Sequence, residues 1–121
     1  MATISDFQNI EMKVGMILSA EYIEGADKLL KLSVDFGTTA QTDEAGVVTE
    51  TKDIRQILSG IREYYSPEEL VGKQCPFVTN LLPRTLRGFT SHGMILAVKT
   101  KDGGAVLLHP DREVLPGSAL S

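Results

Sequence analysis

The short stretch SPEEL, residues 66–70, decides the fold, because it predicts a single helix in a chain that otherwise consists of strands. Ser66 is a suitable N-cap, Pro67 fits the first helical position, and Glu69 follows at the third position of a capping box. Gly72 then ends the helix after little more than one turn. The strands on either side of this helix therefore determine the architecture.

Three strands are predicted before the helix. Residues 13–23 alternate in hydrophobicity, which predicts a long strand, and Gly15 indicates a bulge or a sharp bend. Its expected inward face consists of Val14, Met16, Leu18, Ala20 and Tyr22. Residues 29–36 predict a second strand, and residues 54–59 a third. The polar stretch 37–53 between them is interpreted as a long hairpin connection, with a short strand around VVT.

The inward face of the second strand is expected to consist of Leu30, Leu32, Val34 and Phe36. After the helix, residues 74–80, 93–99 and 105–109 supply the remaining strands. One helix between the third and fourth strands of a small all-β chain predicts a five-stranded Greek-key barrel of the OB type, with a short C-terminal extension. Six short strands could also form a sandwich, so this alternative stays open on the pattern alone.

Composition places the chain among ordinary globular proteins. With 121 residues, 42% hydrophobic and 23% charged, it fits one domain spanning residues 1–121. No apolar run approaches the roughly 20 residues that a membrane span needs, and the N-terminus lacks the pattern of a secretory signal. The only cysteine, Cys75, forms no internal disulfide, so we expect a reducing, cytoplasmic location.

The sequence offers no catalytic motif. His92 and His109 are the only histidines, and neither has a nucleophile nearby in sequence, although a spatial pairing stays open. One cysteine and two histidines do not supply the usual ligands of a structural zinc site, and no phosphate-binding glycine motif is present. We therefore expect a binding module with no cofactor and no metal.

The distribution of charge points to an anionic ligand. The net charge is −4, which taken alone disfavours nucleic acid. Residues 70–101, however, contain no acidic residue and carry a charge of +5. The five cations are Lys73, Arg84, Arg87, Lys99 and Lys101. A basic region on an acidic body could focus a polyanion onto one surface.

The loop NLLPRTLRGFTSHGMIL, residues 80–96, concentrates groups that suit nucleic acid. Arg84 and Arg87 can donate to phosphates or base edges, and Asn80 and Ser91 can hydrogen-bond a base or a sugar. Met94 offers a soft apolar surface for a base. The alternative is an ordinary solvated connection with Met94 in the core, and composition does not decide between the two.

The order of motifs along residues 7–117 resembles the tRNA-binding domains of OB fold. These domains occur at the C-terminus of bacterial methionyl-tRNA synthetases, in small free tRNA-binding proteins and in eukaryotic synthetase-associated cytokine precursors. The matching segments are KVGMI, ADKLLKLSVDFG, RQILSGI, YYSPEELVGK, NLLPRTLRGFTSHGMILAV and LPG. The resemblance covers nearly the whole chain and includes the loop 80–96.

The resemblance implies a module that recognises the folded shape of tRNA and assists a synthetase, in cis or in trans, without activating an amino acid. The implied tRNA-binding residues are Asn80, Arg84, Arg87, Ser91 and Met94, extended by Lys13, Lys31, Arg55 and Ser59. It also implies a homodimer formed near the chain ends. The implied interface residues are Val106, Leu108, Val114, Leu115 and Pro116, with a contribution from the N-terminal stretch.

Three positions depart from the family pattern. Leu82 and Thr85 stand where lysines are common, and His92 stands where glutamine or glutamate is usual. The missing lysines predict weak tRNA binding. They also favour an alternative function, since one branch of the family is chaperone-like in protein export and binds peptides through an apolar groove. Met1 and the compact ending favour a complete small protein or a separate β subunit.

Overall fold

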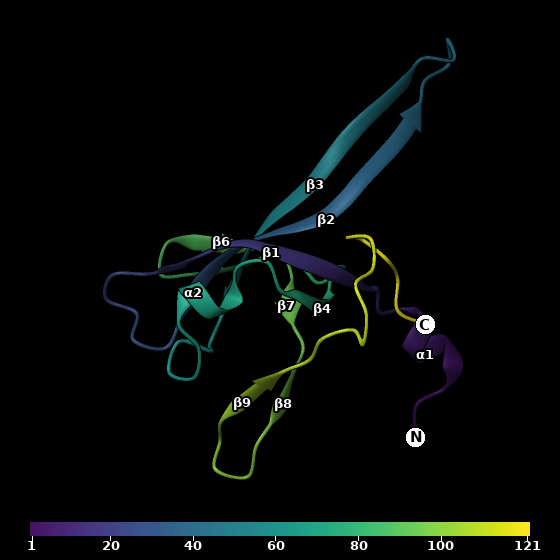
Figure 1. Cartoon of the computed structure of the whole chain (residues 1–121). Coiled ribbons are helices and arrows are strands. Elements are labelled where there is room, and N and C mark those ends of the chain that lie inside the picture. Colours follow the sequence, from purple (N-terminus) through teal and green to yellow (C-terminus); the bar gives the residue numbers. More distant parts are fainter.

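The computed structural model covers residues 1–121 and is built mainly from antiparallel strands (Figure 1). Its elements are α1 (Ile4–Gln8), β1 (Met12–Tyr22), β2 (Leu30–Thr42), β3 (Val48–Ser59), α2 (Pro67–Leu70), β4 (Gln74–Val78), β5 (Arg84–Leu86), β6 (Phe89–Ser91), β7 (Met94–Ile95), β8 (Ala97–Lys99) and β9 (Ala105–Leu107). Neither helix is long and apolar enough to cross a membrane.

Five strands form a curled sheet in the order β3-β2-β1-β4-β7. Its two edges meet where the segment before β7 reaches β3: the backbone N–H of His92 donates to the carbonyl of Gln56 at 2.9 Å. Gly93 permits this approach, because a Cβ there would lie 3.0 Å from Ile57 Cδ1 and 3.1 Å from the carbonyl oxygen of Val78. The predicted five-stranded barrel of OB type, with α2 between the third and fourth strands, is confirmed.

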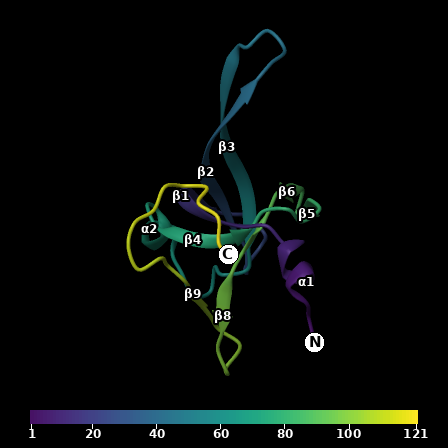
Figure 2. The same ribbon diagram turned by 90° about the vertical axis from the view of Figure 1, so that its right-hand side faces the viewer.

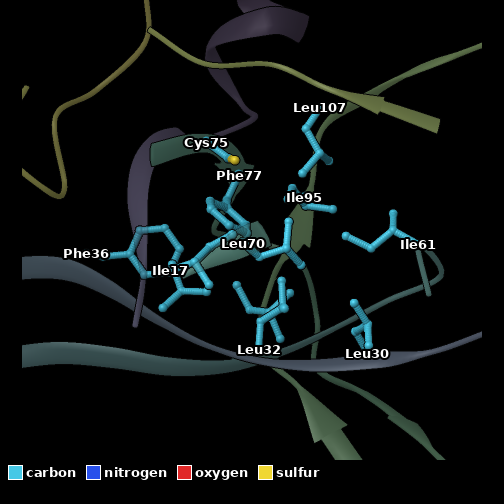
Figure 3. Packing of buried hydrophobic residues seen from close by; sticks show 12 residues of the cluster. Ile17, Leu30, Leu32, Phe36, Ile61, Leu70, Cys75, Phe77, Ile95 and Leu107 are labelled. Carbon is cyan, nitrogen blue, oxygen red and sulfur yellow. The ribbon is translucent and has the colours of Figure 1, made fainter. Parts of the chain in front are cut away.

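The core lies inside the curl of the sheet (Figure 3). All four predicted inward residues of β2 are buried. The ring of the last of them, Phe36, meets Phe77 of β4 edge to face, with centroids 5.3 Å apart and planes at 85°. Burying side chains of this size contributes about 1.5–3 kcal/mol each, so this cluster is the main source of stability.

The predicted helix α2 is present with its expected start. The N–H of Ser66 donates to Glu69 Oε2 at 2.7 Å, and the Ser66 hydroxyl donates to the same oxygen at 3.1 Å. Pro67 and Leu70 are buried against the core. These hydrogen bonds to the Glu69 carboxylate lower the pKa of its side chain, because they stabilise the ionised form.

The predicted inward face of β1 is partly wrong. A bulge between Ile17 and Ser19 shifts the register against β2. As a result Ile17 is fully buried, whereas Leu18 and Tyr22 are exposed. Gly15 does not form the bulge; it makes room for β2, because a Cβ there would lie 2.4 Å from Val34 Cγ1.

The interpretation of residues 37–53 as a long hairpin connection is wrong in its extent, although the short strand expected around VVT lies at the start of β3. β2 and β3 stay paired from Thr38–Lys52 to Thr42–Val48, and they form a two-stranded arm that projects from the barrel (Figure 1). Only residues 43–47 make the turn, where Asp43 Oδ1 accepts from the N–H groups of Ala45 and Val47 at 2.9 Å each. The arm was missed because it is exposed on both faces and therefore shows no alternation of hydrophobicity.

Three smaller differences concern the rest of the chain. The N-terminal helix α1 was not predicted, because it is one turn long and buries none of its residues. The predicted strand 93–99 is two strands, since β7 joins the barrel sheet while β8 pairs with β9. Residues 117–120 run beside the start of β1, where the N–H of Gly117 donates to the carbonyl of Val14 at 2.7 Å.

Candidate nucleic-acid interface

The basic loop contains a hairpin that the sequence did not predict. β5 and β6 pair from Arg84–Ser91 to Leu86–Phe89, which leaves Arg87 and Gly88 as a two-residue turn. Both have positive φ, 52° and 83°, as the primed turns of tight hairpins require. The usual signal for such a turn is Asn-Gly or Asp-Gly. An arginine in this left-handed region costs about 1–2 kcal/mol, and Arg-Gly is therefore not a usual turn sequence. For this reason the sequence pattern does not indicate the hairpin.

A small second core fixes this hairpin to the barrel. Leu86 and Phe89 pack against a buried cluster of Ile23, Ala26 and Leu58. The Lys31 ammonium lies 4.5 Å from the centroid of the Phe89 ring on the same side of the sheet. Figure 2 shows β5 and β6 beside the base of β3. The hairpin therefore projects from the sheet but is held in place by packing against it.

Two arginines of the hairpin are free to meet a ligand. Arg84 and Arg87 are exposed, and neither guanidinium group makes a hydrogen bond or an ion pair within the protein. Arg87 lines a shallow hollow together with Lys28 of the β1–β2 turn. Met94, 38% exposed, also lies on the surface as expected. Arg84 and Arg87 are thus exposed for contact with a phosphate or a base edge, and Met94 for contact with a base, as the sequence predicts.

The three cations that were expected to extend this surface are paired with carboxylates instead. Lys13 lies 3.5 Å from Glu11, and Lys31 lies 3.3 Å from Glu21. The Arg55 side chain is 23% exposed and binds both carboxylate oxygens of Asp53, at 2.9 and 3.0 Å. Each pairing reduces the charge available to a phosphate.

Arg55 holds the two ends of the basic loop. Its Nη1 donates to the carbonyl of Thr79 at 2.6 Å and to the carbonyl of His92 at 3.2 Å. Its guanidinium carbon also lies 5.3 Å from the centroid of the Phe36 ring. The predicted tRNA-binding residue Arg55 thus ties β3 to both ends of the segment 80–91.

Thr79 and Asn80 join the same end of the barrel to the N-terminal segment. The Thr79 hydroxyl donates to Glu11 Oε1 at 2.6 Å, and this hydrogen bond is the main cause that lowers the pKa of Glu11. The Asn80 side chain accepts from the N–H of Glu11 at 2.8 Å and donates to the carbonyl of Asn9 at 2.9 Å. Asn80 therefore positions the chain, although the sequence predicted a contact with RNA.

Two predicted tRNA-binding serines are buried. Ser91 is 2% exposed, and its hydroxyl accepts from the N–H of Leu58 at 3.0 Å and donates to the carbonyl of Gly93 at 3.0 Å. Ser59 is 7% exposed at the end of β3. The expectation that these hydroxyls face a ligand is corrected: Ser91 completes the missing backbone pairing where the barrel closes.

The family model of the tRNA binding domain matches residues 12–119, which include every strand of the fold. The chain belongs to the tRNA-binding domain family. Methionine–tRNA ligase of Bacteroides fragilis is 42% identical over 113 residues, which are 93% of this chain and 15% of that protein. The chain thus spans well under a fifth of the length of the curated relatives it matches.

Solved structures of the family agree with the fold. The MetRS-related protein from Pyrococcus horikoshii has a TM-score of 0.83 at 34% identity, with coverage of 100% of this chain and 98% of that one. The chaperone CsaA from Bacillus anthracis has a TM-score of 0.80 at 30% identity, with coverage of 100% and 99%. The same fold is therefore present in proteins described by two different functions.

The basic segment of this tRNA-binding domain does not form one surface. Arg84 lies on β5 and Arg87 in the turn that follows it, but Lys99 and Lys101 lie on and beside β8. Figures 1 and 2 show the β8–β9 hairpin on the opposite side of the barrel from β6. The expectation of a single +5 surface is corrected to a smaller basic region at the β5–β6 hairpin.

The spatial pairing of a cysteine with a histidine exists but does not make a nucleophile. Cys75 Sγ lies 3.6 Å from His109 Nδ1, which donates to the carbonyl of Gln74 at 2.7 Å. Burial raises the pKa of the Cys75 thiol from 9.0 to about 11, so the thiol stays protonated at neutral pH. No group of three or more His, Cys, Asp or Glu could hold a metal ion.

Of the five residues predicted for a dimer interface, three are exposed and two are half-buried. Val106, Leu108 and Leu115 are exposed. Val114 and Pro116 are half-buried, and the Gln74 side chain holds the backbone of Val114 through hydrogen bonds of 2.5 and 3.0 Å. A second apolar region lies at the chain ends. It consists of the exposed side chains Ile4, Phe7, Ile10 and Leu120, which surround one hollow.

Proposed function

We propose that this chain is a non-catalytic tRNA-binding module, with the β5–β6 hairpin as its main phosphate contact. The observation that carries the proposal is the family match over residues 12–119. In this chain the two unpaired arginines, Arg84 and Arg87, lie on one hairpin. Guanidinium groups without internal partners can bind phosphate without first breaking an ion pair. The acidic remainder of the chain limits non-specific attraction, so the affinity depends on this small surface.

Removing both hairpin arginines is expected to weaken tRNA binding at least about tenfold at low salt, since each forms charge-assisted hydrogen bonds. In the variant Arg84→Ala/Arg87→Ala, the slope of log affinity against log salt becomes shallower by about 1.4–1.8, because two phosphate contacts are lost. A salt titration of binding to bulk tRNA, followed by fluorescence anisotropy, measures both quantities.

The matched control is Lys99→Ala/Lys101→Ala, which removes the same charge from the β8–β9 side of the barrel. It should leave the affinity and the slope close to those of the wild type. Equal losses in the two variants would show that overall charge, and not the hairpin, governs binding.

The link to methionyl-tRNA synthesis is part of the proposal. The relatives named methionine–tRNA ligase are about 40% identical to the chain over most of its length, so we propose that it delivers tRNA to a synthetase, in cis or in trans. A cytoplasmic location belongs to the same proposal, because tRNA charging takes place there and the buried thiol suits a reducing compartment.

Peptide binding is a second candidate function, favoured by one observation. Leu82, at a position where the family often has lysine, is 88% exposed at the tip of the loop before β5. The structural likeness to chaperone CsaA agrees with this candidate. Binding of an apolar peptide that persists in high salt, together with no binding to tRNA at low salt, would place this function ahead of the first.

We also propose a homodimer formed by the chain ends. Helix α1 has five residues and buries none of them, and isolated helices this short are unstable in water. A second copy covering the apolar region Ile4, Phe7, Ile10 and Leu120 would stabilise it. We expect sedimentation equilibrium to show a dimer and Phe7→Glu to be a monomer. The control Val48→Glu, on the exposed arm, should stay dimeric; a monomeric wild type at all concentrations contradicts the proposal.

A further inference from the structure

Beside the basic hairpin lies a hollow for which neither the family match nor the sequence gives a role. It opens between β3 and the segment that joins β4 to β5, and Ile54, Gln56, Leu81, Pro83 and His92 line its sides. A second hollow continues it across β3, since both share residues 54–56. Pro83 directly precedes Arg84, so the first hollow adjoins the free arginines.

The hollow is already formed without a ligand. Arg55 lies in its wall, where Asp53 and the carbonyls of Thr79 and His92 bind the guanidinium group on several sides. The backbone N–H of His92 is fixed in addition by its 2.9 Å hydrogen bond to β3. A ligand entering here therefore meets a preorganised site, which lowers the entropic cost of binding.

The chemistry of the walls suits a flat, partly apolar group with a polar edge. Ile54 and Leu81 are 48% and 40% exposed, so they offer apolar surface to a ligand. The ring of His92 is exposed and makes no hydrogen bond within the protein. Gln56 donates its Nε2 to the carbonyl of Thr90 at 2.9 Å, which leaves its Oε1 free to accept. A nucleobase has the flat face and the donor edge that these groups would bind.

A phosphate is a poor occupant for the same hollow. The only charged group in its wall is Arg55, whose charge is balanced by Asp53 at 2.9 Å. A paired duplex is also a poor occupant, because its bases are stacked and present no open face. An unpaired nucleotide can place its base in the hollow while the neighbouring phosphates approach Arg84.

We propose that this hollow is a subsite for one unpaired nucleobase of the RNA, with His92 as the stacking residue and Gln56 as the acceptor for the base edge. The inference rests on the proposed tRNA-binding function and specifies its ligand, because it requires a single-stranded or looped nucleotide in addition to the folded shape. His92 is a departure from the usual residue of the family, so the subsite would be a property of this chain.

The test compares His92→Ala with His92→Tyr, which keeps an aromatic face, for binding to bulk tRNA and to a fully paired RNA duplex. Losing a base stack should weaken tRNA binding about tenfold, with no change in the salt slope because no phosphate contact is lost. His92→Tyr should bind tRNA like the wild type, and duplex binding should not change in either variant. The control His109→Ala changes the other histidine, which lines a different hollow, and should have no effect.

Three results would overturn the subsite. In the first, His92→Ala binds tRNA as tightly as the wild type. In the second, both RNAs lose affinity equally, and the salt slope falls as it would for a lost ionic contact. In the third, the wild type binds neither tRNA nor the duplex at low salt, and the proposed function then fails as well. A loss on Arg84→Ala/Arg87→Ala without a loss on His92→Ala would remove the subsite and leave the function standing.

Discussion

Replacing Gly117 by alanine is expected to lower the free energy of unfolding by about 3 kcal/mol or more. Gly117 has a φ of 89°, and a Cβ at this position would lie 2.0 Å from the carbonyl oxygen of Phe36. This oxygen belongs to the backbone of Phe36 in β2, and the Phe36 side chain is buried in the core. The oxygen therefore cannot move aside without disturbing the core. Both the strained backbone and the steric clash therefore oppose the substitution.

The backbone crossing of the C-terminal turn over β2 is also close at Gly37. A Cβ on Gly37, whose φ is 88°, would lie 2.3 Å from the carbonyl oxygen of Pro116. The C-terminal turn and the base of the arm thus touch backbone to backbone, and this contact sets where the arm leaves the barrel. Gly37→Ala should be destabilising for the same reason.

Gly46 provides the matched control, because it has a φ of 82° but no atom within 4 Å of the place that a Cβ would occupy. Gly46→Ala should cost only the strain of the left-handed region, about 1–2 kcal/mol. Urea unfolding followed by circular dichroism measures the three variants. If Gly117→Ala and Gly46→Ala lost the same stability, the close crossing would not be a feature of the folded protein in solution.

The sequence predicted those strands in which buried and exposed side chains alternate regularly, and the helix whose capping residues are characteristic. The alternation in β2 identified the four buried side chains correctly, and the capping residues located α2. The arm shows the limit of this reasoning. It is stabilised by the pairing of two polar strands with each other, and pairing between exposed strands produces no pattern of buried residues. The bulge in β1 made part of the expected inward face wrong for a related reason, since one extra residue inverts an alternation of period two from that point on.

For the candidate site, the sequence supplied the residue types but not their internal partners. Asn80 and Glu11 are 69 residues apart in the chain, and their hydrogen bond occupies the side-chain oxygen of Asn80, although the residue stays exposed. The ion pair of Lys31 likewise depends on the register of β1 against β2. Which cations remain free for a ligand is decided by such long-range pairings, and these follow from the complete fold. His92 differs from the residue that is usual in the family, but no spacing in the sequence indicates the hollow that it lines.

The second large effect is expected at Arg55. Arg55→Ala removes the donor from the carbonyls of Thr79 and His92 and leaves Asp53 without its partner, so it should lower the free energy of unfolding by about 2–3 kcal/mol. The same change should weaken tRNA binding, because the ends of the segment 80–91 lose their connection to β3 and the hairpin arginines lose their fixed positions.

Arg55→Lys separates this positioning role from a direct contact with RNA. A lysine keeps the positive charge but cannot reproduce the planar fork that reaches Asp53 and both carbonyls at once. If Arg55 positions the loop, Arg55→Lys should bind tRNA nearly as weakly as Arg55→Ala, and both should keep the salt slope of the wild type. If Arg55 instead binds a phosphate, lysine should restore most of the affinity, and alanine should make the slope shallower by about 0.7–0.9. The slope thus distinguishes an arginine that builds the site from one that touches the ligand.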